Sequence, residues 1–179
     1  MLDSTTTILA MTPAWQDHLS PGDIVSFRFP VREAGPGDRL KARPCLVLEI
    51  EEMAGQRFAL LAYGTSSPRR ANWGYEVHAL HHEDHATFGL DRPTRFIGKR
   101  RLMVSLDNSG FASCRGTGSP VLGQLSGGPA ERLLVVRARI QAERDMAAEM
   151  FADRRRRRMA PVVVERRRPK QMIRAGGAA

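Results

Sequence analysis

The sequence predicts a mainly β domain with one late helix, an α+β fold built on a small β-barrel. Short apolar or alternating segments of strand length recur between turn residues from position 21 to position 125. A single segment, 130–150, instead repeats its apolar residues at helical spacing. No internal repeat is evident. Many short strands with frequent turns and one late helix favour a single barrel with the helix packed against it.

The first expected strand is 23–29, which alternates in character and follows a turn at Ser20-Pro21-Gly22. The second, 44–50, is an almost continuous apolar run, so we expect it to be central and buried on both sides. Between them, residues 30–42 carry Gly35-Pro36-Gly37 and read as a mobile loop. The remaining expected elements are a strand at 57–63 after a turn at 54–55, short strands at 75–80, 94–97 and 101–106, a polar helical turn at 81–87, and 121–125 as a last strand or an approach to the helix.

The charge pattern divides the chain into a flexible lead-in (1–20), a barrel domain with its helix (21–150) and an Arg-rich tail (151–179). The formal net charge is +9, but residues 150–179 hold ten Lys or Arg and two acidic residues, a balance of +8. The other residues carry 18 basic and 17 acidic side chains, a balance of +1. A globally basic nucleic-acid binder is therefore excluded. We expect the tail to be disordered, either as an aid to RNA capture or as an appendage.

The composition predicts a cytoplasmic protein. Mean hydropathy is −0.34 and no apolar run has the length of a membrane span. The N-terminus lacks the basic start and apolar stretch of a secretory signal. Cys45 falls within an expected strand, far in sequence from Cys114, which favours a buried reduced thiol.

A candidate phosphate site follows from how polar residues are joined to three strand-like segments. The segments are 21–25, 43–48 and 60–67, and Arg43 opens the second while Thr65 closes the third. A guanidinium fork matches phosphate oxygens, and a hydroxyl can add a further bond. An exposed arginine fixed by Pro44, and a turn threonine bonding its own backbone, are the simpler alternatives.

The order Gly22-Asp23, then Arg43-Pro44 before an apolar strand, then a strand ending in Thr65-Ser66 resembles the PemK/MazF family of growth-inhibiting toxins. The resemblance covers about residues 20–145. It implies an SH3-like β-barrel with helices, usually a homodimer, that cuts single-stranded RNA without a metal or other cofactor. It also implies a type II toxin–antitoxin pair, with an antitoxin protein as partner.

The resemblance implies catalytic roles for four residues. Arg43 corresponds to the arginine on the scissile phosphate, and Thr65 to the hydroxyl residue at the end of the third strand. Asp38 lies in the loop where relatives carry a carboxylate, but the usual Glu-Gln and Gly before the arginine are replaced here by residues 38–42. Asp91 lies in a segment that contributes an acid in some relatives, although the arginine expected two positions earlier is Gly89. Loop and turn roles explain Asp38 and Asp91 equally well.

Further residues near these positions are candidates for binding RNA. Trp73 could stack a base beside basic neighbours, or could fold onto the barrel or a dimer partner. Lys41 could attract the RNA backbone. The predicted RNA-binding residues are Lys41, Ser66, Ser67, Arg69, Arg70 and Trp73.

Three other interpretations stay open. A cluster of His78, His81, His82 and His85 could bind zinc, since His81 and His85 lie four residues apart. No third ligand of suitable pattern accompanies that pair. A surface turn is therefore favoured, and no metal site is predicted. The altered 38–42 loop favours a barrel that binds nucleic acid without cutting it. A toxin that inhibits a protein target is the third, since toxins acting on a topoisomerase share the fold implied by the resemblance.

Overall fold

The computed structural model describes residues 14–30, 40–68 and 73–159 of the chain. The chain divides into two compact units, Met1–Glu143 and Arg144–Ala179. The first contains all the strands of the described part, and the described part of the second is helical. Asp38, Arg69 and Arg70, three of the predicted site residues, lie outside the described residues.

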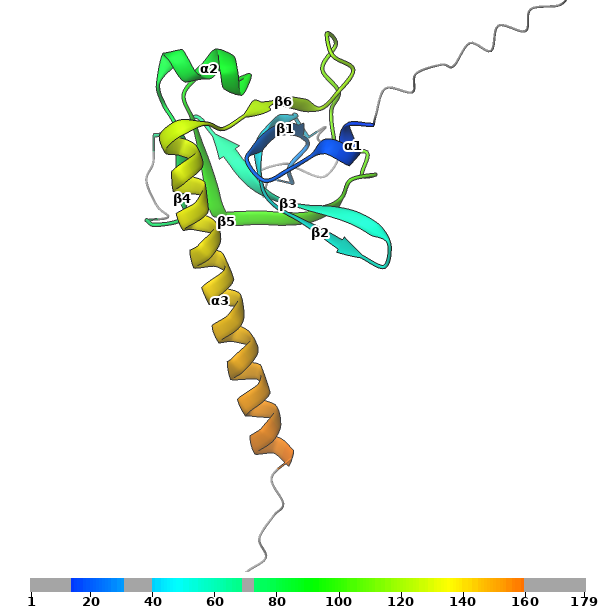
Figure 1. Cartoon of the computed structure of the whole chain (residues 1–179), viewed down its shortest axis with the longest axis vertical. Coiled ribbons are helices and arrows are strands. Elements are labelled where there is room, and N and C mark those ends of the chain that lie inside the picture. The colour runs from blue at the N-terminus through cyan, green and yellow to red at the C-terminus, as the bar shows by residue number, and fades with distance from the viewer. Residues whose placement is uncertain (1–13, 31–39, 69–72, 160–179) are drawn as a thin grey trace, which may run out of the picture. The chain divides into compact units, whose positions relative to one another are not determined.

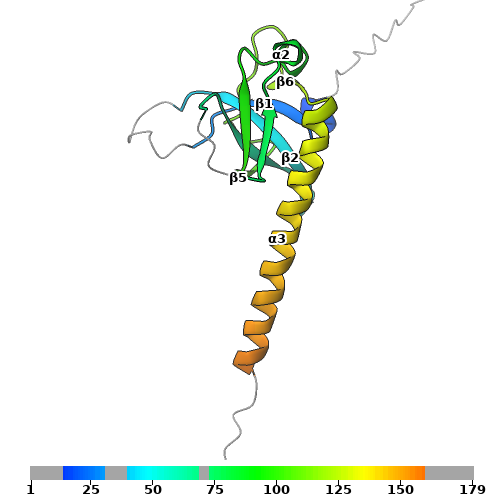
Figure 2. The same ribbon diagram turned by 90° about the vertical axis from the view of Figure 1, so that its left-hand side faces the viewer.

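Unit 1 is built on one six-stranded antiparallel sheet in the order β4-β5-β3-β2-β1-β6. The sheet curls into a half-barrel (Figures 1 and 2), so the prediction of a mainly β, α+β domain is confirmed at that level. The strands are β1 (Asp23–Phe27), β2 (Arg43–Met53), β3 (Gln56–Thr65), β4 (Glu76–Ala79), β5 (Thr94–Ser105) and β6 (Val121–Gln124). The helices are α1 (Trp15–His18), α2 (His82–Phe88) and α3 (Gly127–Met159).

The β2–β3 hairpin has the tight turn that the sequence indicated. Met53 pairs with Gln56, and the two residues between them, Ala54 and Gly55, have φ of 52° and 76°. Two consecutive residues in the left-handed region form the hairpin turn whose twist matches that of the strands. The hairpin brings the far ends of β2 and β3 together, and a register shift between Val47 and Glu49 sets their pairing at the candidate site.

The expected strands 94–97 and 101–106 are one strand. β5 runs without interruption from Thr94 to Ser105, but its pairing with β3 jumps between Ala62–Arg101 and Tyr63–Ile97. The extra residues form a bulge, in which the Gly98 amide donates to the Tyr75 carbonyl at 2.7 Å. Glycine and polar residues inside the run (Gly98 to Arg101) suggested a break in the strand, whereas a bulge accommodates them and bends the sheet.

Both faces of the sheet are covered by apolar side chains. One cluster includes Leu46, Phe96 and the α3 residues Leu133, Val136 and Ile140; the other includes Val25, Val47 and Tyr63. Residues 45–48 of β2 are at most 1% exposed, which confirms the prediction of a central strand buried on both sides. Neighbours in sequence such as Leu46 and Val47 fall into different clusters, as expected for a strand.

The two ends of the domain differ from the sequence prediction. Residues 15–19 were assigned to a loose lead-in, but Trp15 packs on Phe111 with ring centres 4.9 Å apart, and Leu19 is buried. The Arg57 guanidinium also donates to the carbonyls of Gln16 and Leu19. At the other end, helix was expected only to position 150, yet α3 continues to Met159. The first part of the expected tail is therefore helical. No helix in the described part of the chain is long and apolar enough to cross a membrane.

Candidate functional site

The site is organised by the register of four neighbouring strands. Thr65 on β3 is paired with Arg95 on β5, and Arg95 is paired with His78 on β4. On the other side of β3, Cys45 pairs with Tyr63, and the same register two residues further on places Arg43 opposite Thr65. Directly opposed residues share a face of the sheet. Arg43, Thr65, Arg95 and His78 thus form one polar row across β2, β3, β5 and β4, spanning about 14 Å at ~4.8 Å per strand spacing.

A cavity of about 420 Å³ lies at the β2–β3 end of this row. Three segments far apart in sequence line it: 41–44, 64–66, and the residues Asp91, Arg92 and Thr94. The structure therefore brings together five of the predicted site residues, which are Lys41, Arg43, Thr65, Ser66 and Asp91. The lining offers three cationic side chains, three hydroxyls and one carboxylate. Such a set can hold a phosphate and exchange a proton with a group bound to it.

Arg43 is exposed at the mouth of this cavity. Its guanidinium lies 5.8 Å from the ring centre of the buried Tyr63, and Arg100 stacks on the same ring at 4.0 Å. Tyr63 thus provides a buried aromatic surface beside both guanidinium groups. Because Arg43 is exposed and lines the cavity, its fork of donors can reach a ligand there.

Gly64 brings the Arg43 and Thr65 strands close together. A Cβ atom at this position would lie 2.2 Å from the Pro44 carbonyl oxygen and 3.1 Å from Phe96 Cε1. No side chain larger than hydrogen fits while β2 and β3 keep this separation. The glycine, which the sequence suggested only as part of a strand-ending pattern, is a steric requirement of the site.

Thr65 makes the turn bond considered from the sequence and keeps a donor for the proposed contact with an anion. Its Oγ1 accepts a hydrogen bond from the Ser67 amide at 3.2 Å, which is the local turn arrangement of a threonine at a strand end. A hydroxyl that accepts still has its own hydrogen to donate. The turn bond therefore fixes the Thr65 side chain while its hydrogen can serve a bound anion, and it also anchors Ser67 next to it.

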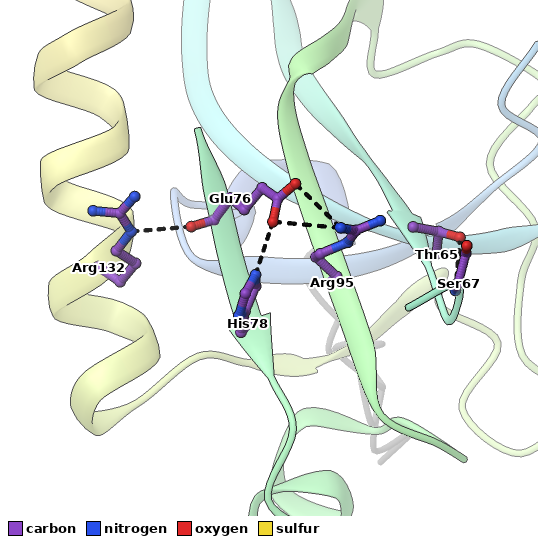
Figure 3. Close-up of polar contacts among 6 residues, drawn as sticks. All are labelled: Thr65, Ser67, Glu76, His78, Arg95 and Arg132. Atoms are coloured by element: carbon purple, nitrogen blue, oxygen red, sulfur yellow. Dashed lines mark hydrogen bonds and ion pairs between the residues drawn. The ribbon is translucent and has the colours of Figure 1, made fainter. Parts of the chain in front are cut away.

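A buried ionic cluster at the β4–β5 end of the row was missed by the sequence analysis (Figure 3). Glu76 accepts from Arg95 Nη1 at 3.2 and 3.5 Å and is bonded to His78 Nε2 at 3.0 Å. The side chains of Glu76 and Arg95 are each 8% exposed, and that of His78 is 33% exposed. Arg132 of α3 donates from Nε to the Glu76 carbonyl at 3.0 Å, which ties β4 to the helix. The alternation Glu76-Val77-His78-Ala79 was the available signal, since two polar residues on one side of a short strand share a face.

Trp73 lies in a different cavity, of about 400 Å³, which also contains Gly74, His78 and Arg132. Trp73 is 78% exposed. It therefore does not fold onto the barrel, which was one of the two alternatives to stacking a base. The cavity adjoins the ionic cluster through Glu76 and His78.

The histidines do not form a metal centre within the described part of the chain. No group of three or more His, Cys, Asp or Glu side chains is placed there to hold an ion. His78 instead belongs to the Glu76 cluster, and His85 is buried on α2. Both cysteines are free, and burial raises the pKa of the Cys45 thiol to about 12, so it is no nucleophile at neutral pH.

No protein-family model matches the chain, and no curated protein matches it in sequence. The fold and the site together define an α+β domain with a cationic, hydroxyl-lined cavity at the ends of its strands.

Proposed function

We propose that the protein is a metal-independent endoribonuclease that acts as the toxin of a toxin–antitoxin pair. The observation that carries this proposal is the cavity where Arg43, Thr65 and Asp91 meet from three separate segments. Convergence of a cation, a hydroxyl and a carboxylate in one cavity is what transfer of a phosphoryl group requires.

The reaction uses a nucleophile carried by the substrate. The 2′-oxygen of the RNA attacks the adjacent phosphorus, the bond to the 5′-oxygen breaks, and the products are a 2′,3′-cyclic phosphate and a 5′-hydroxyl. The proton lost by the 2′-hydroxyl passes to Asp91, the carboxylate lining the cavity. A second proton, from solvent or a cationic neighbour, reaches the departing 5′-oxygen. No cofactor has a role in these steps.

Arg43 and Thr65 stabilise the transition state. Negative charge builds on the non-bridging oxygens during attack, and the Arg43 guanidinium neutralises it while the Thr65 and Ser66 hydroxyls donate to the same oxygens. Arg43 remains protonated, so it serves as a charge and not as a base. Lys41 and Arg92, which also line the cavity, extend the positive field toward the flanking phosphates.

The preferred substrate is single-stranded RNA. An exposed Trp73 offers an aromatic face to an unpaired base, which a duplex would keep stacked.

Two protein partners are also proposed: a second copy of the chain and an antitoxin. On α3, the exposed side chains of Met146 and Met150 support a protein contact, since apolar side chains four residues apart share one helix face.

Cleavage assays test this proposal directly. Purified protein is incubated with 5′-labelled single-stranded RNA in EDTA, and the products are examined for a 2′,3′-cyclic phosphate. The matched substrate has one 2′-deoxynucleotide at the cleaved position, which should block that cut and no other. Loss of cleavage in EDTA with recovery in a divalent ion would refute the metal-free mechanism. RNA binding without cleavage would point to the non-catalytic barrel, and growth inhibition without RNA binding to a protein target.

A further inference from the structure

We infer that a second phosphate-binding subsite lies beside the Arg43 cavity, formed by Arg95, His78 and the hydroxyls of residues 65–67. It would take the phosphate of a nucleotide next to the cleaved bond on the same RNA strand. The inference rests on the proposed function for the identity of the ligand, and it assigns a role to the ionic cluster that the cleavage step leaves unused.

The subsite is a separate cavity of about 230 Å³ that adjoins the first. Its lining consists of residues 65–68 together with His78, Leu80, Pro93 and Arg95. Thr65 and Ser66 line both cavities, so they form the wall between them. A nucleic-acid strand that crosses the row from β2 to β4 therefore meets Arg43, then Thr65, then Arg95 and His78.

Arg95 is the residue that indicates a ligand. It is buried, and only its Nη1 atom donates to Glu76, whereas its buried Nε–H has no hydrogen-bond partner among the described residues. Buried donors in native proteins are nearly always satisfied, and a functional role or a bound water or ion is among the explanations for an exception. A guanidinium with donors left over beside a cavity lined by hydroxyls is suited to bind a phosphate.

Glu76 holds Arg95 and His78 in position for this task. Its carboxylate accepts from Arg95 and from His78 Nε2, which fixes both side chains on the β4–β5 face. In the imidazolium form of His78, the three side chains carry one net positive charge. Nδ1 of that form is a second donor, and His78 lines the cavity.

A cycle that pairs protein variants with modified substrates tests the subsite. RNA substrates differ only in one methylphosphonate, a neutral linkage, placed one position to either side of the cleaved bond. The proteins are the wild type, Arg95→Lys and His78→Gln, with Arg115→Lys and His18→Gln as matched controls at exposed positions. A charge-assisted hydrogen bond of ordinary strength predicts a rise in KM of about 10-fold or more for one of the neutral linkages in the wild type.

The expected result is non-additivity. In Arg95→Lys and His78→Gln the unmodified RNA should already show the raised KM, and the neutral linkage should add little, while both controls behave like the wild type. The inference is overturned if the neutral linkage costs the same in these variants as in the wild type, or if neither linkage matters. Should Arg95→Lys fail to fold by circular dichroism, His78→Gln and Ser67→Ala, at partly or fully exposed positions, carry the same cycle.

The same cycle separates failure of the subsite from failure of the proposed function. If the wild type cleaves no RNA, binding of the same oligonucleotides is measured by fluorescence anisotropy. Non-additivity in Kd then supports the subsite while the nuclease proposal falls. Absence of any oligonucleotide binding overturns both.

Discussion

Replacing Arg43 by alanine should abolish cleavage while leaving the fold almost unchanged, and the structure separates the two effects. Arg43 is exposed, and its interaction with Tyr63, at 5.8 Å, lies near the limit of a cation–π contact. Contacts of this kind at exposed sites contribute about 0.5–1 kcal/mol, so the free energy of unfolding should fall by no more than that. Loss of one preorganised donor to a transition-state oxyanion lowers kcat by about 10²- to 10³-fold.

Arg100→Ala is the matched control for this substitution. Arg100 stacks on the same Tyr63 ring at 4.0 Å but does not line the cavity that holds Arg43. Single-turnover cleavage at saturating RNA, together with urea denaturation, should therefore show a collapse of rate in Arg43→Ala only. Arg43→Lys should also cleave poorly, because an ammonium lacks the planar fork. If Arg43→Ala cleaves within a few-fold of the wild type, or if Arg100→Ala loses as much, the assignment of Arg43 to the scissile phosphate is wrong.

Three further predictions test the surroundings of the site. Gly64→Ala should destabilise the domain by about 1–3 kcal/mol and reduce cleavage, because the new Cβ atom would meet the Pro44 carbonyl. Gly116→Ala is the control, since its Cβ atom would enter open space, and it should change neither the urea denaturation curve nor the cleavage rate. Below pH 9, Cys45 should have no effect on the free energy of unfolding. From pH 9 toward 12 that free energy should fall by up to about 1.4 kcal/mol per pH unit, because the folded state holds the Cys45 thiol proton more tightly. Denaturation curves of Cys45→Ala should lose this slope, and those of Cys114→Ala should keep it. Deleting residues 151–179 should raise KM, flatten the salt dependence of RNA binding and leave kcat nearly unchanged. The full-length and truncated proteins should bind equally well at high salt. Loss of kcat at saturating RNA would instead make the tail part of the catalytic unit.

Local patterns predicted most of the fold because each strand carries its own signal. The buried run of β2, the turn at residues 54–55 and the helical spacing after position 130 are properties of neighbouring residues. The break expected between 97 and 101 was wrong because a bulge accommodates glycine and charged residues inside a continuous strand. The sequence predicts the helix end too early, because the run Arg154–Arg158 is typical of a solvated tail although arginine is also a good helix former.

The β2–β3 half of the site could be predicted, and the β4–β5 half could not, for a topological reason. Arg43 and Thr65 are at the two ends of consecutive strands joined by a hairpin, so a short loop implies that they meet. Arg95 joins this row only because β5 inserts between β3 and β4, an order that departs from the order of the strands in sequence. A sequence read along its length considers His78 with the nearby histidines, whereas the sheet pairs it with Arg95.

The proposed subsite would give the buried Glu76–Arg95 pair a role beyond stability. Replacing a buried ion pair by apolar residues of similar volume is often neutral or stabilising, so stability alone is weak evidence for keeping it. The pair stands in line with the exposed Arg43 and with Thr65, and it adjoins two cavities through His78. If the proposed function holds, the buried cluster would set the register of the bound strand, and the exposed Arg43 would contact the reacting phosphate. Substitutions at Arg95 or His78 should therefore act mainly on KM and on the choice of the cleaved bond, whereas those at Arg43 should act on kcat.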